Sequence, residues 1–353
     1  MNRRALLSPL LLSILTLSTL PTSAETYAEK LGWKAGDRVV IIHVDDAGMS
    51  HDSNVGTLRA IREGVANSLS VMMPCPWVPE IVRAIKDDPE LDAGLHLTLT
   101  SEWDVYRWGP VAGKPTVPGL VDSDGALWDN VPLVVANATA DEVETEIRAQ
   151  IDRARTMGFE PTHLDSHMGT LFATPEFIER YIKVGADTGI PIMFPGGHNS
   201  LLEREYRNDT IRALKRSGKW EEGMEIPPNA RVEMGRQTGP LVWDAGLPVL
   251  DDLHNQSYGW RLEDVENTDE NLRAMKVERY SEAFRELEPG VTMMILHATD
   301  AGATFPFISG SGPTRRGDFL AMIDPELRRV IDEEGLILTT WRELGERRRA
   351  VGD

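Results

Sequence analysis

Alternation between apolar, β-type runs and segments of helical period constrains this chain more than any other feature of its sequence. Six or more such runs occur, among them residues 39–44, 93–99, 162–166 and 291–296. Segments with apolar residues at helical spacing lie between them, and this order is typical of βα units around a parallel sheet. We therefore predict an α/β fold, a distorted (β/α) barrel of seven or eight units that resembles a TIM barrel.

The first residues have the pattern of a secretory signal rather than that of a folded element. Arg3 and Arg4 form a basic start, residues 5–20 are mostly apolar, and Ala24 ends a sequence typical of a cleavage site. No later stretch reaches the roughly 20 apolar residues that a bilayer-spanning helix needs. We predict a signal peptide over residues 1–24, a single barrel domain over residues 25–353, and export to the periplasm or the medium.

Charge and cysteine content argue against several classes of protein. The formal net charge is −19, and a surface of this sign disfavours nucleic acids and anionic membranes as partners. The single cysteine, Cys75, rules out an internal disulfide and a zinc site built from several cysteines. We therefore expect no nucleic-acid partner and no membrane span.

Two adjacent carboxylates end the first predicted strand. Asp45 and Asp46 follow the apolar run 39–44, and burying both is costly unless a cation or a proton donor meets them. Because successive side chains of a strand alternate between its faces, we expect these carboxylates to point to opposite sides and to have different roles. An isolated pair of this kind is also consistent with a helix cap beside a surface acid.

Further polar residues lie at the carboxyl ends of three other predicted strands. They are His96, His163, Asp165, His167 and His297. Since the carboxyl ends of parallel strands form one rim of a barrel, we expect these side chains to meet Asp45 and Asp46 there. One aspartate and two histidines suit Zn²⁺ or another divalent ion and leave a position for water. A carboxylate such as Asp165 could instead orient a metal-binding histidine from behind.

Three sequence blocks resemble the signature blocks of the YdjC-like carbohydrate deacetylases. This family includes chitooligosaccharide deacetylases and is related to the polysaccharide deacetylases. The blocks are Val44-Asp45-Asp46-Ala47-Gly48-Met49-Ser50, Gly94-Leu95-His96-Leu97-Thr98-Leu99-Thr100 and Pro161-Thr162-His163-Leu164-Asp165-Ser166-His167. Residues 250–259 and 293–297 are similar to later family segments more loosely, so the resemblance covers most of the chain.

The resemblance implies a distorted (β/α) barrel and metal-dependent removal of N-acetyl groups from amino sugars or oligosaccharides, a hydrolysis of non-peptide C–N bonds. By motif position, Asp46, His96 and His167 would hold one divalent ion, Zn²⁺ or Mg²⁺. Asp45 would be the general base for the attacking water, and His297 the general acid for the leaving amine. The expected partner is therefore a small-molecule or oligosaccharide substrate that carries N-acetyl groups.

Other residues are expected around the metal rather than on it. Asp165 and His163 would support the ligands from behind, whereas His43 is interpreted as structural. Aromatic side chains on loops around a barrel mouth can stack on sugar rings, and polar residues of the later family-like segment could join them. The candidates for substrate binding are Trp103, Trp108, Asp252, His254 and Tyr258.

Two alternative functions use the same residues differently. The same site could hydrolyse another amide or an ester. An exported sugar-binding barrel without catalysis is the second alternative, although binding alone needs neither a base such as Asp45 nor an acid such as His297.

Overall fold

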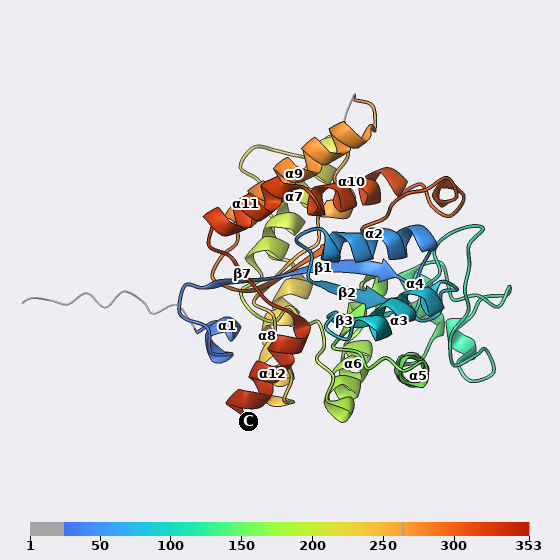
Figure 1. The fold of residues 1–353 in the computed structure, drawn as a ribbon. Coiled ribbons are helices and arrows are strands. Elements are labelled where there is room, and N and C mark those ends of the chain that lie inside the picture. Colours follow the sequence, from blue (N-terminus) through green and yellow to red (C-terminus); the bar gives the residue numbers. More distant parts are fainter. Residues whose placement is uncertain (1–24, 263–264, 353) are drawn as a thin grey trace, which may run out of the picture.

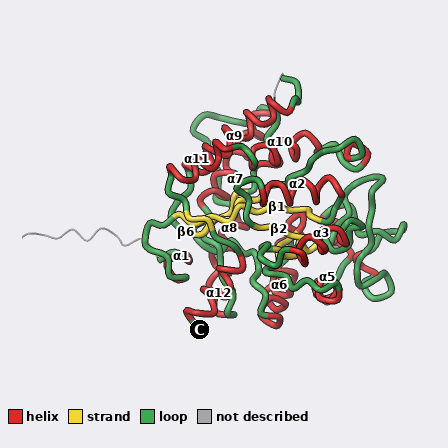
Figure 2. Tube along the Cα trace, viewed as in Figure 1, coloured by secondary structure: helices red, strands yellow, loops and turns green. Residues whose placement is uncertain are grey.

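Parallel strands form a curled sheet at the centre of the molecule (Figures 1 and 2). The computed structural model describes residues 25–262 and 265–352, so the predicted signal peptide, residues 1–24, lies outside the described residues. Neighbouring strands follow the order β4–β3–β2–β1–β6–β5, and β7 pairs with β1. The strands are β1 (Arg38–Ala47), β2 (Ser68–Val71), β3 (Ala93–Leu97), β4 (Leu164–Ser166), β5 (Asp252–His254), β6 (Gly290–Leu296) and β7 (Ile337–Leu338).

The outer strands β4 and β5 are connected through the segment 192–195. Leu164 of β4 forms a parallel bridge with Ile192, and Pro195 forms one with Leu250, just before β5. The predicted α/β class with parallel strands is confirmed, and the curled sheet forms a half-barrel. A complete barrel of seven or eight units is not shown, because the described residues contain no assigned strand between β4 and β5.

Helices cover both sides of the sheet. In Figure 1, α2, α9, α10 and α11 lie on one side and α5, α6 and α12 on the other. A capping box begins α5, where the Thr139 hydroxyl accepts from the backbone N–H of Glu142. The helices are α1 (Tyr27–Lys30), α2 (His51–Arg62), α3 (Val78–Asp87), α4 (Val131–Asn137), α5 (Ala140–Thr156), α6 (Pro175–Thr188), α7 (Ser200–Arg216), α8 (Ala230–Asp244), α9 (Asp269–Arg285), α10 (Gly312–Met322), α11 (Pro325–Glu333) and α12 (Trp341–Val351).

Two segments without a clear sequence pattern are part of the fold. Residues 218–246 contain the whole of helix α8, and the long stretch 100–138 contains α4 and the short 3₁₀ helix η1 (Pro118–Leu120). Val117, Leu120 and Leu127 bury that stretch against the main apolar core. No helix within residues 25–262 and 265–352 is long and apolar enough to cross a bilayer.

Strand β1 separates two apolar cores because its side chains alternate between the faces of the sheet. Val40, Ile42 and Val44 pack with residues of α9, α10 and α11. Val39 and Ile41 pack instead with β6 and α12, on the inner side of the curl. Both faces are therefore covered, as a parallel sheet requires.

His43 and Asp45 continue the inner series after Ile41. His43 is fully buried, with its Nδ1 2.9 Å from the Ser68 hydroxyl and its Nε2 3.0 Å from the Ser70 hydroxyl of β2. The alternation of β1 thus carries polar side chains into the inside of the sheet at its carboxyl end.

Glycine at position 94, in β3, makes room for a buried histidine. A methyl group added there would lie 2.5 Å from both ring nitrogens of His163, whose ring stacks on Trp341 with 5.1 Å between centroids. We expect Gly94→Ala to lower the free energy of unfolding by about 1–3 kcal/mol, as overpacking of a core does. Urea unfolding measures this loss. Gly310→Ala, where an added methyl meets open space, is the control, and equal stability of the two variants would contradict the prediction.

Candidate active site

One aspartate and two histidines meet at the carboxyl ends of β1, β3 and β4. The Oδ1 atom of Asp46 lies 3.3 Å from His96 Nε2 and 3.5 Å from His167 Nδ1. All three side chains are buried, and one ligand atom of each lies within 4.8 Å of the others. The structure therefore brings together the three residues that the sequence suggested as metal ligands.

Asp46 has an unusual backbone conformation that turns its side chain into this site. Its φ angle is +65°, in the left-handed region that a residue other than glycine rarely adopts, and the pairing of β1 with β2 is irregular between Val44 and Ala47. As a result both carboxylates approach the same nitrogen, His96 Nε2. Asp45 Oδ2 lies 3.7 Å from this atom, and Asp46 Oδ1 lies 3.3 Å from it. The expectation that the two carboxylates point to opposite sides is wrong. Such strain persists where function requires it.

The two oxygens of Asp46 have different surroundings. Oδ2 accepts a 2.6 Å hydrogen bond from Nη1 of the buried Arg315, in α10. Oδ1 is buried and has no hydrogen-bond partner among the described residues. Burial would raise the pKa of this carboxyl, but Arg315, His167 and His96 hold it well below its usual range. Asp46 is therefore an ionised acceptor with one oxygen left for a cation.

Both histidines present a nitrogen to that oxygen because carboxylates hold their other nitrogens. His96 Nδ1 lies 2.6 Å from Asp165 Oδ1, and His167 Nε2 lies 3.0 Å from Glu102 Oε2. Since an ionised carboxylate only accepts, these nitrogens carry the hydrogens, and His96 Nε2 and His167 Nδ1 are left to bind a metal.

The charge around the two rings favours a cation at this position. Burial alone would lower the pKa of both rings, but nearby carboxylates raise that of His167 to about 9 and that of His96 well above its ordinary value. Two imidazoles and a carboxylate form a donor set that suits a divalent first-row ion such as Zn²⁺. These residues therefore fit a metal site.

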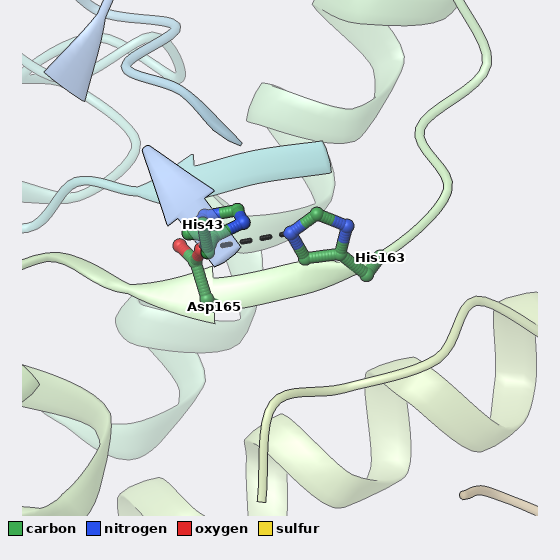
Figure 3. Close-up of side chains that lie close together, drawn as sticks. All are labelled: His43, His163 and Asp165. Carbon is green, nitrogen blue, oxygen red and sulfur yellow. Dashed lines mark ion pairs between the residues drawn. The ribbon is translucent and has the colours of Figure 1, made fainter. Parts of the chain in front are cut away.

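Asp165 connects the metal site to two further buried histidines. Figure 3 shows His43 and His163 beside its carboxylate, with His43 Nε2 3.0 Å and His163 Nε2 3.7 Å from Oδ2. Burial would raise the pKa of Asp165, but His96, His163 and His43 hold it well below its usual range. His43 Nε2 also lies 3.2 Å from Asp45 Oδ1, so this ring links Asp165 to the candidate base.

His297 completes the site from the end of β6. Its Nε2 atom lies 3.9 Å from Asp45 Oδ2 and 3.9 Å from Asp46 Oδ2. The ring packs edge-on against Tyr258, with 5.0 Å between centroids. Burial, together with the nearby Arg315, lowers the pKa of His297.

A cavity of about 820 Å³ opens over these residues. Of the residues suggested from sequence, those that line it are Asp45, Asp46, His96, Trp103, His167, Tyr258 and His297. Within residues 25–262 and 265–352, two other groups of side chains could hold an ion, His43–His163–Asp165 and Asp45–His96–Asp165. Only the Asp46–His96–His167 group has all its members on the cavity wall, which favours it as the site of chemistry.

Three candidates for substrate binding lie away from the cavity wall. Trp108 is buried, and its Nε1 donates to the Thr100 carbonyl at 2.9 Å. Asp252 Oδ2 accepts from the backbone N–H of Leu201 at 2.9 Å, in the first turn of α7. His254 is buried beside Trp260, with 5.5 Å between ring centroids.

Sequence reasoning missed three residues of the site. They are His43, Glu102 and Arg315. A signal existed for His43, because it precedes Asp45 by two positions and so shares its face of the strand. Glu102 follows β3 in an irregular loop, and Arg315 lies 269 positions from Asp46, so neither has a local pattern that points to the site.

Comparison with known proteins gives relatives over most of the chain. A family model described as YdjC-like protein matches residues 39–333. A carbohydrate deacetylase of Thermus thermophilus is 30% identical over 321 residues, which cover 90% of this chain and 97% of the relative. A chitooligosaccharide deacetylase of Yersinia enterocolitica is 29% identical over 136 residues, 37% of this chain and 49% of the relative.

One solved structure supports the fold. A putative cellobiose-phosphate cleavage protein of Enterococcus faecalis superposes with a TM-score of 0.64 and covers 87% of this chain and 99% of its own. Its sequence identity is 19%, so this likeness concerns the fold alone.

Proposed function

The chain belongs to the YdjC-like protein family, and we propose that it is a metal-dependent hydrolase that removes N-acetyl groups from amino sugars or oligosaccharides. The observation that carries this proposal is the meeting of the Asp46–His96–His167 group with Asp45 and His297 in one cavity. The name carbohydrate deacetylase, borne by a relative that matches most of the chain, supports the same activity.

In this proposal Asp46, His96 and His167 hold one divalent ion, Zn²⁺ or Mg²⁺. When bound, the ion would supply Lewis acidity toward a water molecule and the amide carbonyl. Asp165 and Glu102 keep the two rings oriented through the hydrogen bonds to their outer nitrogens. Arg315 holds Asp46 ionised through its second oxygen.

Asp45 and His297 carry the proton in this scheme. Asp45 takes a proton from the water whose oxygen adds to the acetyl carbon. His297 gives a proton to the amide nitrogen as the C–N bond breaks, which yields acetate and the free amine. Burial lowers the pKa of His297, which favours the neutral form of the ring. It can then receive its proton from Asp45, 3.9 Å away.

Substrate binding and export are further parts of the proposal. Trp103 and Tyr258 line the cavity, where their rings can stack on a sugar. The substrate is an N-acetylated amino sugar or its oligosaccharide. The basic and apolar character of residues 1–24 supports export to the periplasm or the medium.

Metal content and acetate release test the proposal together. We expect elemental analysis of the purified chain to give one zinc or magnesium ion per chain, and we expect acetate release from N,N′-diacetylchitobiose. A chelator should abolish this release, and added metal should restore it. Metal-dependent hydrolysis of esters or non-sugar amides, without any release of acetate from amino sugars, would refute the substrate class. Sugar binding with no hydrolysis of any acyl bond would refute the enzyme.

A further inference from the structure

The cavity has an apolar wall that hydrolysis of an acetyl group does not use. Its residues come from the segment after β4, the segment 193–195 and helices α6, α7 and α8. They are Phe172, Ile178, Met193, Phe194, Leu202 and Val232. None of them can hydrogen-bond to a sugar hydroxyl through its side chain.

This wall is a fixed surface. Met193, Phe194 and Val232 are buried, and Phe172 packs against Phe194 with 5.7 Å between ring centroids. The backbone of Met193 donates to the Leu164 carbonyl of β4 at 2.7 Å, which anchors the wall to the sheet beside the catalytic residues. The wall is therefore preformed for a ligand.

The apolar wall and the metal site line the same cavity, together with a group of polar residues. Phe172 lies five positions after the candidate ligand His167, at the end of the segment η2 (His167–Phe172), which is kinked at Met168 and Gly169. The polar residues on the α7 and α8 side of the cavity include Asn199, Glu205, Asp209, Asn229 and Arg231. Of these, Asp209 and Arg231 are exposed to solvent. A ligand at the metal site thus has, in the same cavity, both the apolar wall and the polar residues of the α7 and α8 side.

The size of the cavity also exceeds what an acetyl group requires. Its volume of about 820 Å³ lies in the upper part of the roughly 300–1,000 Å³ range of ligand pockets. Water against such a wall is readily displaced by an apolar group, because this removes apolar surface from water on both sides.

We propose that the apolar wall binds the acyl chain of the substrate, and that this site takes N-acyl amino sugars with a medium-length chain such as octanoyl. The acyl chain is bonded directly to the carbonyl carbon of the amide, and this carbon must lie at the metal site. Its first methylene therefore lies in the cavity that the apolar wall lines, with no sugar ring between the metal site and the acyl chain. This inference rests on the proposed function, because it places the scissile amide at the Asp46–His96–His167 group.

Binding to the full chain provides the first test. Chelator prevents turnover, and isothermal titration compares N-octanoyl-glucosamine, below its aggregation concentration, with N-acetyl-glucosamine. We expect the octanoyl sugar to bind on the order of 100-fold more tightly, since each buried methylene contributes roughly a fourfold gain and only part of the chain need be buried. Equal affinities would overturn the inference. If the octyl glycoside of N-acetyl-glucosamine binds more tightly than N-octanoyl-glucosamine, the inference is also overturned, because the wall would then bind an alkyl group on the glycosidic oxygen rather than the acyl chain.

A variant that fills the apolar wall provides the second test. Leu202→Trp places a larger side chain on this half-buried position and should remove most of the preference for octanoyl while leaving the affinity for N-acetyl-glucosamine within about threefold. Leu241→Trp, at a 63% exposed position of α8 outside the cavity, is the matched control and should keep the preference. An unchanged preference in folded Leu202→Trp would count against the wall.

Hydrolysis by the metal-loaded enzyme separates this inference from the proposed function. The native enzyme should cleave the octanoyl amide with a higher kcat/KM than the acetyl amide. If only the acetyl amide is cleaved, the proposed function stands and the acyl-chain inference fails. If no amide is cleaved but the octanoyl sugar binds preferentially and loses this preference in Leu202→Trp, the apolar site stands and the proposed hydrolase fails.

Discussion

An Asp45→Asn variant is expected to fold, to bind metal as the native chain does, and to lose between about 10² and 10⁴ in kcat. The substitution keeps the shape of the side chain and removes its capacity to take a proton. Asp45 lies 3.9 Å from His297 Nε2 through Oδ2 and 3.2 Å from His43 Nε2 through Oδ1, so it faces a histidine ring on each of two sides. The three proposed ligands are unchanged, and metal content should therefore remain at one ion per chain.

Acetate release under saturating substrate, together with elemental analysis of the same sample, measures this effect. The kcat of His297→Ala should fall by a similar factor. The kcat of the double variant Asp45→Asn/His297→Ala should fall little further than that of either single variant, because the two residues serve one proton path. Asp209→Asn is the matched control, since it removes an exposed carboxylate on the α7 side of the same cavity. Full activity of metal-loaded Asp45→Asn would exclude Asp45 as the base.

Strands with strong apolar runs could be predicted from sequence because their burial leaves a local signal. The runs at 93–99 and 291–296 correspond to β3 and β6. The apolar run Leu247–Leu250 precedes β5 without belonging to it, because the ladder with β6 begins at Asp252. Leu250 instead bridges to Pro195. An apolar run reports that residues are buried, and it does not report which neighbour their backbone pairs with.

The site could be predicted where only the rule for the carboxyl ends of parallel strands was needed. The prediction was wrong where it relied on the regular alternation of side chains along β1. The carboxyl-end rule for parallel strands brought His96, His167 and His297 to one place. The alternation rule failed at Asp46, because its φ of +65° ends the regular pleat one residue after Asp45. The partner of Asp46, Arg315, lies on α10 and is brought in only by tertiary packing. Sequence periodicity does not encode such a contact.

A second large effect is expected from a buried ion pair behind His297. Lys276 of α9 and Asp318 of α10 are fully buried, and Nζ donates to Asp318 Oδ1 at 2.7 Å and to the Ser257 carbonyl at 2.6 Å. Asp318 also accepts from Tyr280 at 2.8 Å, and its other oxygen accepts from the backbone N–H of His297 at 3.2 Å. The pair therefore connects two helices to the strand end that carries His297.

Lys276→Met should lower the free energy of unfolding by about 3–5 kcal/mol, because it leaves the Asp318 carboxylate buried without its cation. Burial lowers the pKa of Lys276, and Asp318 counteracts this shift, so the charged form of the lysine depends on its partner. Urea unfolding measures the loss. Lys183→Met is the matched control, because it removes a lysine from an exposed pair with Asp187 and should have a much smaller effect.

The double variant Lys276→Met/Asp318→Leu decides whether the cost comes from the unpaired charge. Without the carboxylate there is no buried anion to leave uncompensated, so the double variant should recover much of the stability that Lys276→Met loses. The double variant also loses the hydrogen bonds that Tyr280 and the backbone N–H of His297 donate to Asp318 and that Lys276→Met keeps, so recovery should be incomplete. If the double variant is no more stable than Lys276→Met, the loss comes from packing around the lysine stem rather than from the charge of Asp318.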